Sequence, residues 1–152
     1  MKALHALLTG LLLVTSFAVA QESPAAALQR RADAATGMDC VHLSMQAARK
    51  ALEDADHDFG AGDLKAAYAA IDLSLHYAQR SVDCSLQSHK GEKTTEINLR
   101  ALIRRMRDIV QTLDSEDRQH LSQSITELEK QRDRLLRGIF GPAAGGSPEK
   151  KP

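Results

Sequence analysis

The long interval without proline constrains this fold more than any other feature of the sequence. Proline is absent between Pro24 and Pro142, helix-forming residues dominate positions 24–137, and no segment of that span alternates apolar with polar residues. Proline disrupts helix interiors, and alternation is the mark of a half-buried strand. The sequence therefore predicts an all-α fold, an antiparallel helical bundle.

Two apolar stripes of similar length predict a helical hairpin in the first half of the chain. Ser23 and Pro24 are typical of a helix start, so a short helix is expected from there to Ala35, before Gly37. The next helix carries apolar residues spaced by three or four: Met38, Val41, Met45, Ala48, Leu52, Ala55 and Phe59. After the glycines at 60 and 62, a second stripe ends near residue 89: Leu64, Ala67, Ile71, Leu75, Ala78, Val82 and Leu86. Neither stripe is stable in water alone, so the two helices should fold back on each other.

The C-terminal half predicts a further pair of helices. A helix is expected to start at Thr94 or Thr95, and capping residues at 114–117 interrupt its pattern. The apolar residues keep one helical phase across this interruption: Leu99, Leu102, Met106, Ile109, Val110 and Leu113, then Leu121, Ile125, Leu128, Leu135 and Ile139. We therefore expect two helices over 94–137, and one long kinked helix is the alternative.

The N-terminus has the pattern of a secretory signal peptide. A basic residue precedes an apolar run over 7–14, and Ala18-Val19-Ala20 is a small-x-small cleavage pattern. We expect residues 1–20 to be removed and residues 21–137 to form one helical domain. Residues 138–152 are rich in Gly and Pro and are expected to form a disordered tail. The expected location is periplasmic or secreted, without stable membrane insertion after cleavage.

The two cysteines are placed to clamp the predicted hairpin. An exported chain meets an oxidising compartment, where an even number of cysteines can pair completely. With the hairpin turn centred on Ala61, Cys40 lies 21 residues before it and Cys84 lies 23 residues after it. These positions are level to within about one helical turn in an antiparallel pair. We expect an intramolecular Cys40–Cys84 disulfide; an intermolecular bridge or two buried thiols are the alternatives.

Composition argues against several functional classes. The chain has 20 basic and 20 acidic residues, so neither nucleic acid nor an anionic membrane is a favoured partner. It has no Trp, three Phe and two Tyr, which leaves little material for an aromatic ligand site. Nucleophile and phosphate-binding motifs are missing. We therefore assign no catalytic or cofactor-binding residue, expect no cofactor and do not expect an enzyme.

The acidic residues and histidines give no complete metal motif. Asp54, Asp56 and Asp58 alternate as in a calcium loop, but Phe59 and Lys65 occupy the positions that need Gly and Glu. No two histidines beyond the signal region are spaced by four residues: His42, His57, His76, His89 and His120. We therefore assign no metal ligand.

Four arginines cluster in the helix expected to start at Thr94 or Thr95: Arg100, Arg104, Arg105 and Arg107. Glu96 and Asp108 lie within one turn of them. A solvated, salt-bridged helix face is the expected outcome.

Two short segments resemble known helical families. Leu113–Gln119 resembles the Leu-Thr-x-x-Gln repeats of periplasmic Spy-type stress chaperones, with Asp114 and Asp117 at the Thr and Gln positions. Gly62 with Ala67 resembles the turn of a tetratricopeptide hairpin, but no 34-residue period exists in the sequence. The first resemblance implies a periplasmic stress protein, and it covers only one helix start.

These features predict an exported helical bundle that acts as a protein-binding or structural module in the cell envelope. The expected partner is another protein or a second copy of the chain, with no nucleic acid. The alternative is a periplasmic metal- or stress-responsive protein, chaperone-like, that uses some of His42, His57, His76 and His120. A small enzyme comes third.

Overall fold

The computed structural model describes residues 23–141, and this part of the chain contains five helices and no strand. The helices are α1 (Pro24–Ala34), α2 (Gly37–Ala61), α3 (Leu64–Ser88), α4 (Glu92–Thr112) and α5 (Ser115–Phe140). The predicted all-α bundle is confirmed, with a hairpin followed by a C-terminal pair of helices. The expected signal peptide and all but the first four residues of the expected tail lie outside the described residues.

Local sequence determines where the helices begin and end. Ser23 caps α1, because its hydroxyl accepts a hydrogen bond from the Ala26 amide at 3.1 Å. Gly60 does not end α2, which continues to Ala61 and is capped by Gly62, whose φ of +77° lies in the region that favours glycine. At the other end of the fold, α5 continues to Phe140, three residues past the expected boundary at 137.

The helices α4 and α5 are separate, so the expected pair forms and the single kinked helix does not. α4 begins at Glu92, two residues before the expected start. Leu113 and Asp114 are extended, with ψ values of 157° and 165°, and the chain reverses there. The Asp114 carbonyl then accepts the Arg118 amide at 3.1 Å as the first bond of α5.

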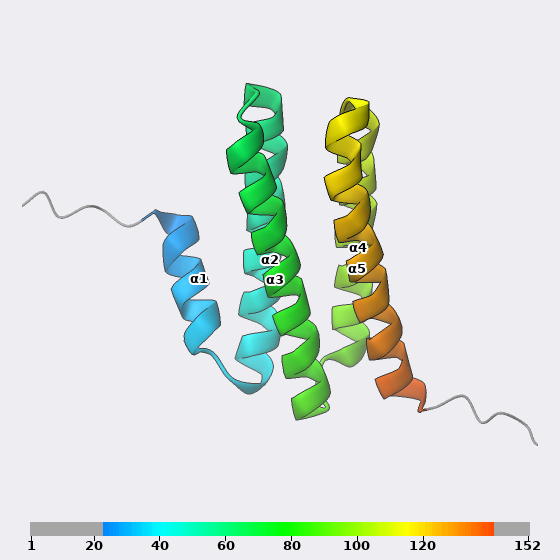
Figure 1. The fold of residues 1–152 in the computed structure, drawn as a ribbon. Coiled ribbons are helices and arrows are strands. Elements are labelled where there is room, and N and C mark those ends of the chain that lie inside the picture. Colours follow the sequence, from blue (N-terminus) through cyan, green and yellow to red (C-terminus); the bar gives the residue numbers. More distant parts are fainter. Residues whose placement is uncertain (1–22, 142–152) are drawn as a thin grey trace, which may run out of the picture.

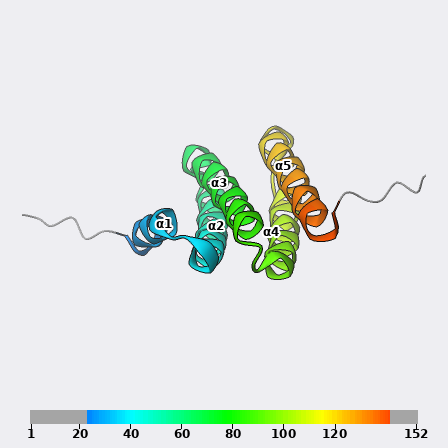
Figure 2. The ribbon, with the colours of Figure 1, turned by 90° about the horizontal axis from the view of Figure 1, so that it is seen from below.

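The two hairpins, α2–α3 and α4–α5, stack side by side (Figures 1 and 2). Figure 2 shows α2 next to α4 and α3 next to α5, with α2 and α5 at opposite corners. The contacts between hairpins keep a nearly constant sequence offset within each helix pair. Arg49–Asn98 and Asp56–Arg105 join α2 to α4 at 49 residues each, and Tyr68–Asp117 and Asp83–Arg134 join α3 to α5 at 49 and 51 residues. A constant offset means that α2 runs parallel to α4 and α3 runs parallel to α5. The fold is therefore a stack of hairpins rather than a ring of antiparallel neighbours.

Small residues let α2 and α3 approach closely. Ser74 donates to the Ala48 carbonyl at 2.8 Å, and Ser81 donates to the Val41 carbonyl at 2.9 Å. Both serines are fully buried. Alanines fill much of the same interface: Ala47, Ala48, Ala51, Ala55, Ala67 and Ala78. Because each carbonyl can accept a second hydrogen bond, the serines set the register of the hairpin without breaking helical bonds.

Cys40 and Cys84 form the predicted intramolecular disulfide at the open end of the α2–α3 hairpin. Their Cα atoms are 6.0 Å apart, and the bridge joins positions separated by 44 residues. Neither cysteine is free, so the alternatives of buried thiols and an intermolecular bridge do not occur.

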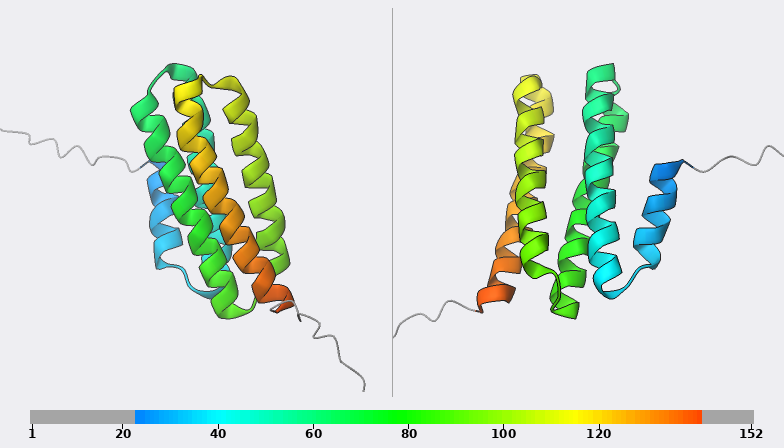
Figure 3. Two further views of the ribbon diagram at one scale, coloured as in Figure 1. Left: turned by 45° about the vertical axis from the view of Figure 1, so that its right-hand side comes forward. Right: turned by 180° about the vertical axis from the view of Figure 1, so that it is seen from behind.

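The helix α1 packs on the outer side of the first hairpin (Figure 3) and is held at its C-terminal end by α3. The Arg80 guanidinium donates to the carbonyls of Ala32 at 3.3 Å, Asp33 at 2.8 Å and Ala35 at 3.4 Å. The Tyr77 hydroxyl donates to the Asp33 carboxylate at 3.1 Å. The Arg80 bonds supply partners for the last carbonyls of α1, of which Ala32 also accepts from the Ala35 amide at 3.3 Å, and the Tyr77 bond holds the Asp33 side chain.

Most predicted stripe residues form the core, but the hairpin turn and the helix ends depart from the prediction. Leu64 is 41% exposed because it lies at the start of α3, beside the turn. Leu75 and Leu86 are only half-buried. Tyr77 and Ile103 are buried although neither lies in a predicted stripe. Tyr77 faces α1, where its hydroxyl contacts Asp33, and Ile103 belongs to the core cluster, so one stripe per helix does not describe either position.

Candidate functional site

A surface hollow of about 330 Å³ lies between the parallel helices α2 and α4. Its lining is Arg49, Leu52, Glu53, Ala101, Leu102 and Arg105. Leu52 and Leu102 are buried and form an apolar floor, whereas the charged residues are exposed and form the rim. The short side chain of Ala101 leaves the space between the two helices open.

Two further hollows adjoin this space, one between the same two helices and one on α4 alone. One, of about 110 Å³, is lined by His42, Met45, Gln46, Arg49 and Asn98. The other, of about 290 Å³, is lined by Ile97, Arg100, Ala101 and Arg104. Arg49 is shared by the first two hollows, and Ala101 is shared by the first and third. We call the three together the α2–α4 groove.

An exposed isoleucine adds apolar surface to the α2–α4 groove. Ile97 is 58% exposed, although it lies in the middle of a well-formed turn of α4. A single exposed apolar side chain is ordinary, but this one adjoins a groove with an apolar floor. The groove therefore combines a floor of buried leucines with one exposed isoleucine, beside charged side chains.

The charged residues of the α2–α4 groove are mostly arginines. Arg105 pairs with Asp56 across the two helices, and Arg49 donates to the neutral amide oxygen of Asn98. Arg104 makes no hydrogen bond or ion pair within the described residues. Four arginines and one glutamate line the groove, so its rim carries positive charge. The arginine cluster that the sequence predicts to form a salt-bridged face is therefore only partly neutralised by acidic side chains.

Glu96 holds one of these arginines in place. Its carboxylate is 7% exposed and accepts from Arg132 of α5 at 2.8 Å and from Arg100 of α4 at 2.7 Å. The hydrogen bond from Arg132, with that from Arg100, lowers the pKa of Glu96 below its ordinary value, against the opposing effect of burial. Sequence spacing had assigned Glu96 to a solvated face; the burial depends on Arg132, which is 36 residues away.

The residues considered as metal ligands are dispersed. Asp54, Asp56 and Asp58 bind separate partners: Lys50 at 2.6 Å, Arg105, and His57 at 3.3 Å. Within residues 23–141 no group of three His, Cys, Asp or Glu side chains is placed to hold a metal ion. The alternating carboxylates diverge because they lie on a helix, where a period of two residues does not share a face.

The histidines also lie apart from one another. His42 lines the α2–α4 groove, and His76 packs edge-on to Tyr77 with ring centroids 5.0 Å apart. His120 of α5 pairs with Asp72 of α3 at 3.1 Å. These three histidines therefore lie in separate parts of the structure and do not contact one another.

An aromatic and polar cluster joins α3 to α5 near the hairpin turns. Tyr68 packs against Phe59 and His120, with ring centroids 5.9 Å and 4.7 Å away. The Tyr68 hydroxyl donates to Asp117, and this hydrogen bond raises the pKa of Tyr68. Sequence reasoning missed the cluster because its members come from three helices. Its contacts join α2 and α3 to α5, so it fastens the two hairpins together.

Comparison of the chain with protein-family models, with curated proteins and with solved structures found no match. None of the described helices is both long and apolar enough to cross a membrane. Among the features of the described residues, the α2–α4 groove is the one that offers a binding surface.

Proposed function

We propose that this protein is an exported binding module of the cell envelope whose α2–α4 groove takes an acidic, amphipathic segment of a partner protein. The observation that carries the proposal is the excess of arginine around a groove with an apolar floor. Binding, rather than catalysis, is the proposed activity.

The charge of the rim favours an acidic partner. Arg104 has no partner within the described chain, and Arg49 contacts only a neutral amide oxygen. Arginine pairs with carboxylates through two parallel hydrogen bonds, which gives both energy and orientation. A partner with carboxylates spaced along one side can contact both arginines.

The apolar floor favours a partner with apolar side chains on its other side. Leu52, Leu102 and Ile97 lie along the groove, between the charged positions. An amphipathic helix lays its apolar face into such a groove through residues spaced by three and four. The partner we propose is therefore a segment that alternates acidic and apolar positions with helical spacing.

Location in the cell envelope is supported by two features. Positions 1–20 have the pattern of a signal peptide, and Cys40 and Cys84 are paired, as is usual outside reducing compartments. The metal-responsive alternative has no such support, because within residues 23–141 no group of three His, Cys, Asp or Glu side chains is placed to hold a metal ion.

A pair of designed peptides tests the proposed binding. The first has leucines spaced by three and four with glutamates beside them, and the second replaces each glutamate by lysine. We expect the acidic peptide to bind roughly tenfold more tightly or better, which is about 1.4 kcal/mol, and its affinity to fall as salt is raised. Isothermal titration calorimetry with the disulfide-bonded protein measures the affinity of each peptide.

Matched charge reversals locate the site. Arg104→Glu should weaken binding of the acidic peptide by roughly tenfold. Arg137→Glu is the control, because Arg137 is also exposed and unpaired in the described chain but lies on α5, outside the groove. Equal affinities for the two peptides, or equal effects of the two substitutions, would overturn the proposal.

A further inference from the structure

We infer that Cys84 is a covalent modification site, the sulfur at which an incoming thiol attacks the Cys40–Cys84 disulfide. The two cysteine residues differ in access: Cys40 is 0% exposed, whereas Cys84 is only half-buried. Exchange proceeds by attack of a thiolate on one sulfur of the disulfide, so access decides which sulfur receives the adduct.

Cys84 opens onto two surface hollows beside the disulfide. One, of about 320 Å³, lies where the α1–α2 connection meets α3 and includes Thr36 and Gly37 in its lining. The other, of about 250 Å³, lies along α3 and includes His76 and Asp83. Cys84 is part of both linings, and Cys40 is part of neither. A thiol therefore reaches the bridge from the α3 side.

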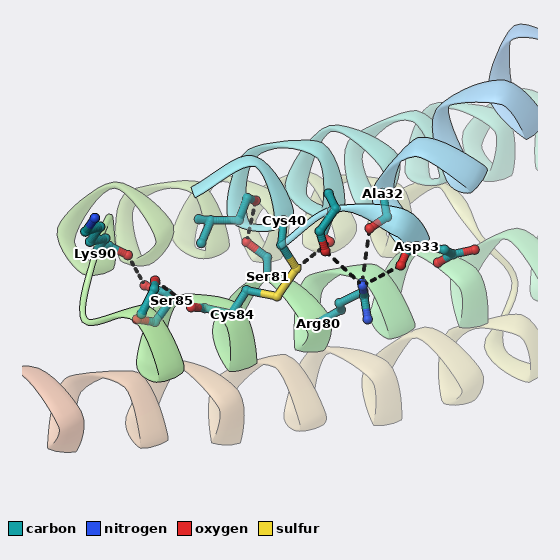
Figure 4. Close-up of a disulfide and its surroundings, with 12 residues drawn as sticks. Ala32, Asp33, Cys40, Arg80, Ser81, Cys84, Ser85 and Lys90 are labelled. Carbon is teal, nitrogen blue, oxygen red and sulfur yellow. Dashed lines mark hydrogen bonds between the residues drawn. A yellow bond between two sulfur atoms is a disulfide. The ribbon is translucent and has the colours of Figure 1, made fainter. Parts of the chain in front are cut away.

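A guanidinium stands beside the path of attack. Arg80 lies one helical turn before Cys84 and lines both hollows, and Figure 4 shows the two side chains together on α3. Its hydrogen bonds to Ala32, Asp33 and Ala35 carbonyls hold it there without neutralising its charge. The nearby carboxylate of Asp83 is paired with Arg134 at 2.6 Å. Arg80 therefore places a positive charge beside the path, which favours an approaching thiolate.

The exchange needs no reductant other than a thiol. A thiolate attacks Sγ of Cys84, the bond between the two protein sulfurs breaks, and its electron pair leaves on Sγ of Cys40, which takes a proton from water. Cys84 then carries the incoming group as a mixed disulfide. A second thiolate can attack the outer sulfur and release Cys84, so two thiols become one disulfide and the protein gains two thiols.

The fold can hold the modified state because other contacts join the same elements. Ser81 donates to the Val41 carbonyl next to Cys40, and Ser74 makes the equivalent bond further along the hairpin. The Cys40 thiol stays beneath the α2–α3 interface, beside the Ser44 hydroxyl at 3.9 Å. The adduct on Cys84 can extend into the adjoining hollows.

The test on the natural sequence uses reduced glutathione as the probe. The disulfide-bonded protein is mixed with glutathione, quenched with acid at early times, alkylated and digested for mass spectrometry. We expect glutathione on Cys84 in roughly tenfold excess over Cys40, and no preference when the same reaction is run in guanidinium chloride. Equal labelling of the folded protein, or a preference for Cys40, would overturn the inference.

Single-cysteine variants provide a second measurement. In Cys40→Ser the remaining thiol is Cys84, and it should react with an aromatic disulfide reagent as an accessible thiol does. In Cys84→Ser the remaining thiol is Cys40, and it should react roughly a hundredfold more slowly, because it must wait for local opening. Similar rates in two variants with native circular dichroism spectra contradict the inference. If either variant unfolds, the glutathione experiment decides alone.

Discussion

Removing the Cys40–Cys84 disulfide should cost this domain a large part of its stability. The bridge joins positions separated by 44 residues, and the chain-entropy relation for a closed loop of that size gives about 4 kcal/mol. Loss of the buried Cys40 sulfur adds about 1 kcal/mol for the space it leaves. A domain of this size loses about 4 °C of melting temperature per kcal/mol, so the expected drop is roughly 15 to 20 °C.

The assay is thermal and urea unfolding of the Cys40→Ala, Cys84→Ala double variant, followed by circular dichroism. Urea unfolding should show a larger denaturant slope for the variant, because its unfolded chain is free to expand and exposes more surface. Reduction of the natural protein should reproduce the lower melting temperature. The same reductant should leave the double variant unchanged, which controls for effects of the reagent.

A small fall in melting temperature would contradict the predicted contribution of the disulfide. If the melting temperature falls by less than about 5 °C and the denaturant slope is unchanged, the unfolded loop is already constrained without the bridge. The serine hydrogen bonds and alanine packing of the α2–α3 hairpin would then hold these helices together in the denatured ensemble.

Two other predictions concern buried polar contacts. Glu96→Gln should destabilise the fold by about 1.5 to 3 kcal/mol at neutral pH, because it removes charge-assisted hydrogen bonds. The Glu96 pKa lies below its ordinary value of 4.5, so this stabilisation is present above that pH and is lost as the pH falls through the folded-state pKa; urea unfolding from pH 7 to 3 should show the variant and natural protein converging. Ser74→Ala should cost about 1 kcal/mol through the lost bond to Ala48, whereas the exposed Ser122→Ala should stay within about 0.5 kcal/mol.

The α2–α3 hairpin and its disulfide could be predicted because local signals determine them. Apolar spacing gives each helix a buried side, Gly62 ends α2, and the number of residues on each side of the turn sets which positions meet. Cys40 and Cys84 are level for this reason alone. The α4–α5 break was harder to predict, because Leu113 and Asp114 turn the chain without shifting the phase of the apolar stripe.

The α2–α4 groove could not be predicted, because it depends on contacts between distant residues. Arg49 and Arg105 look like ordinary exposed residues of their own helices until α2 is placed beside α4. Glu96 could be placed near the arginines on its own helix, but its burial requires Arg132 from α5. Sequence spacing within one helix does not carry that information.

The groove follows from an unequal stacking of the two hairpins. Between α3 and α5 the space is closed by side-chain pairs, among them Tyr68 with Asp117 and Asp83 with Arg134. Between α2 and α4 the helices are in looser contact, and Ala101 faces a hollow instead of a partner. The α3–α5 side therefore acts as the joined edge of the stack, while the α2–α4 side stays open. Shortening side chains on the joined edge should therefore change the width of the groove on the other side, because the same two hairpins form both edges of the stack.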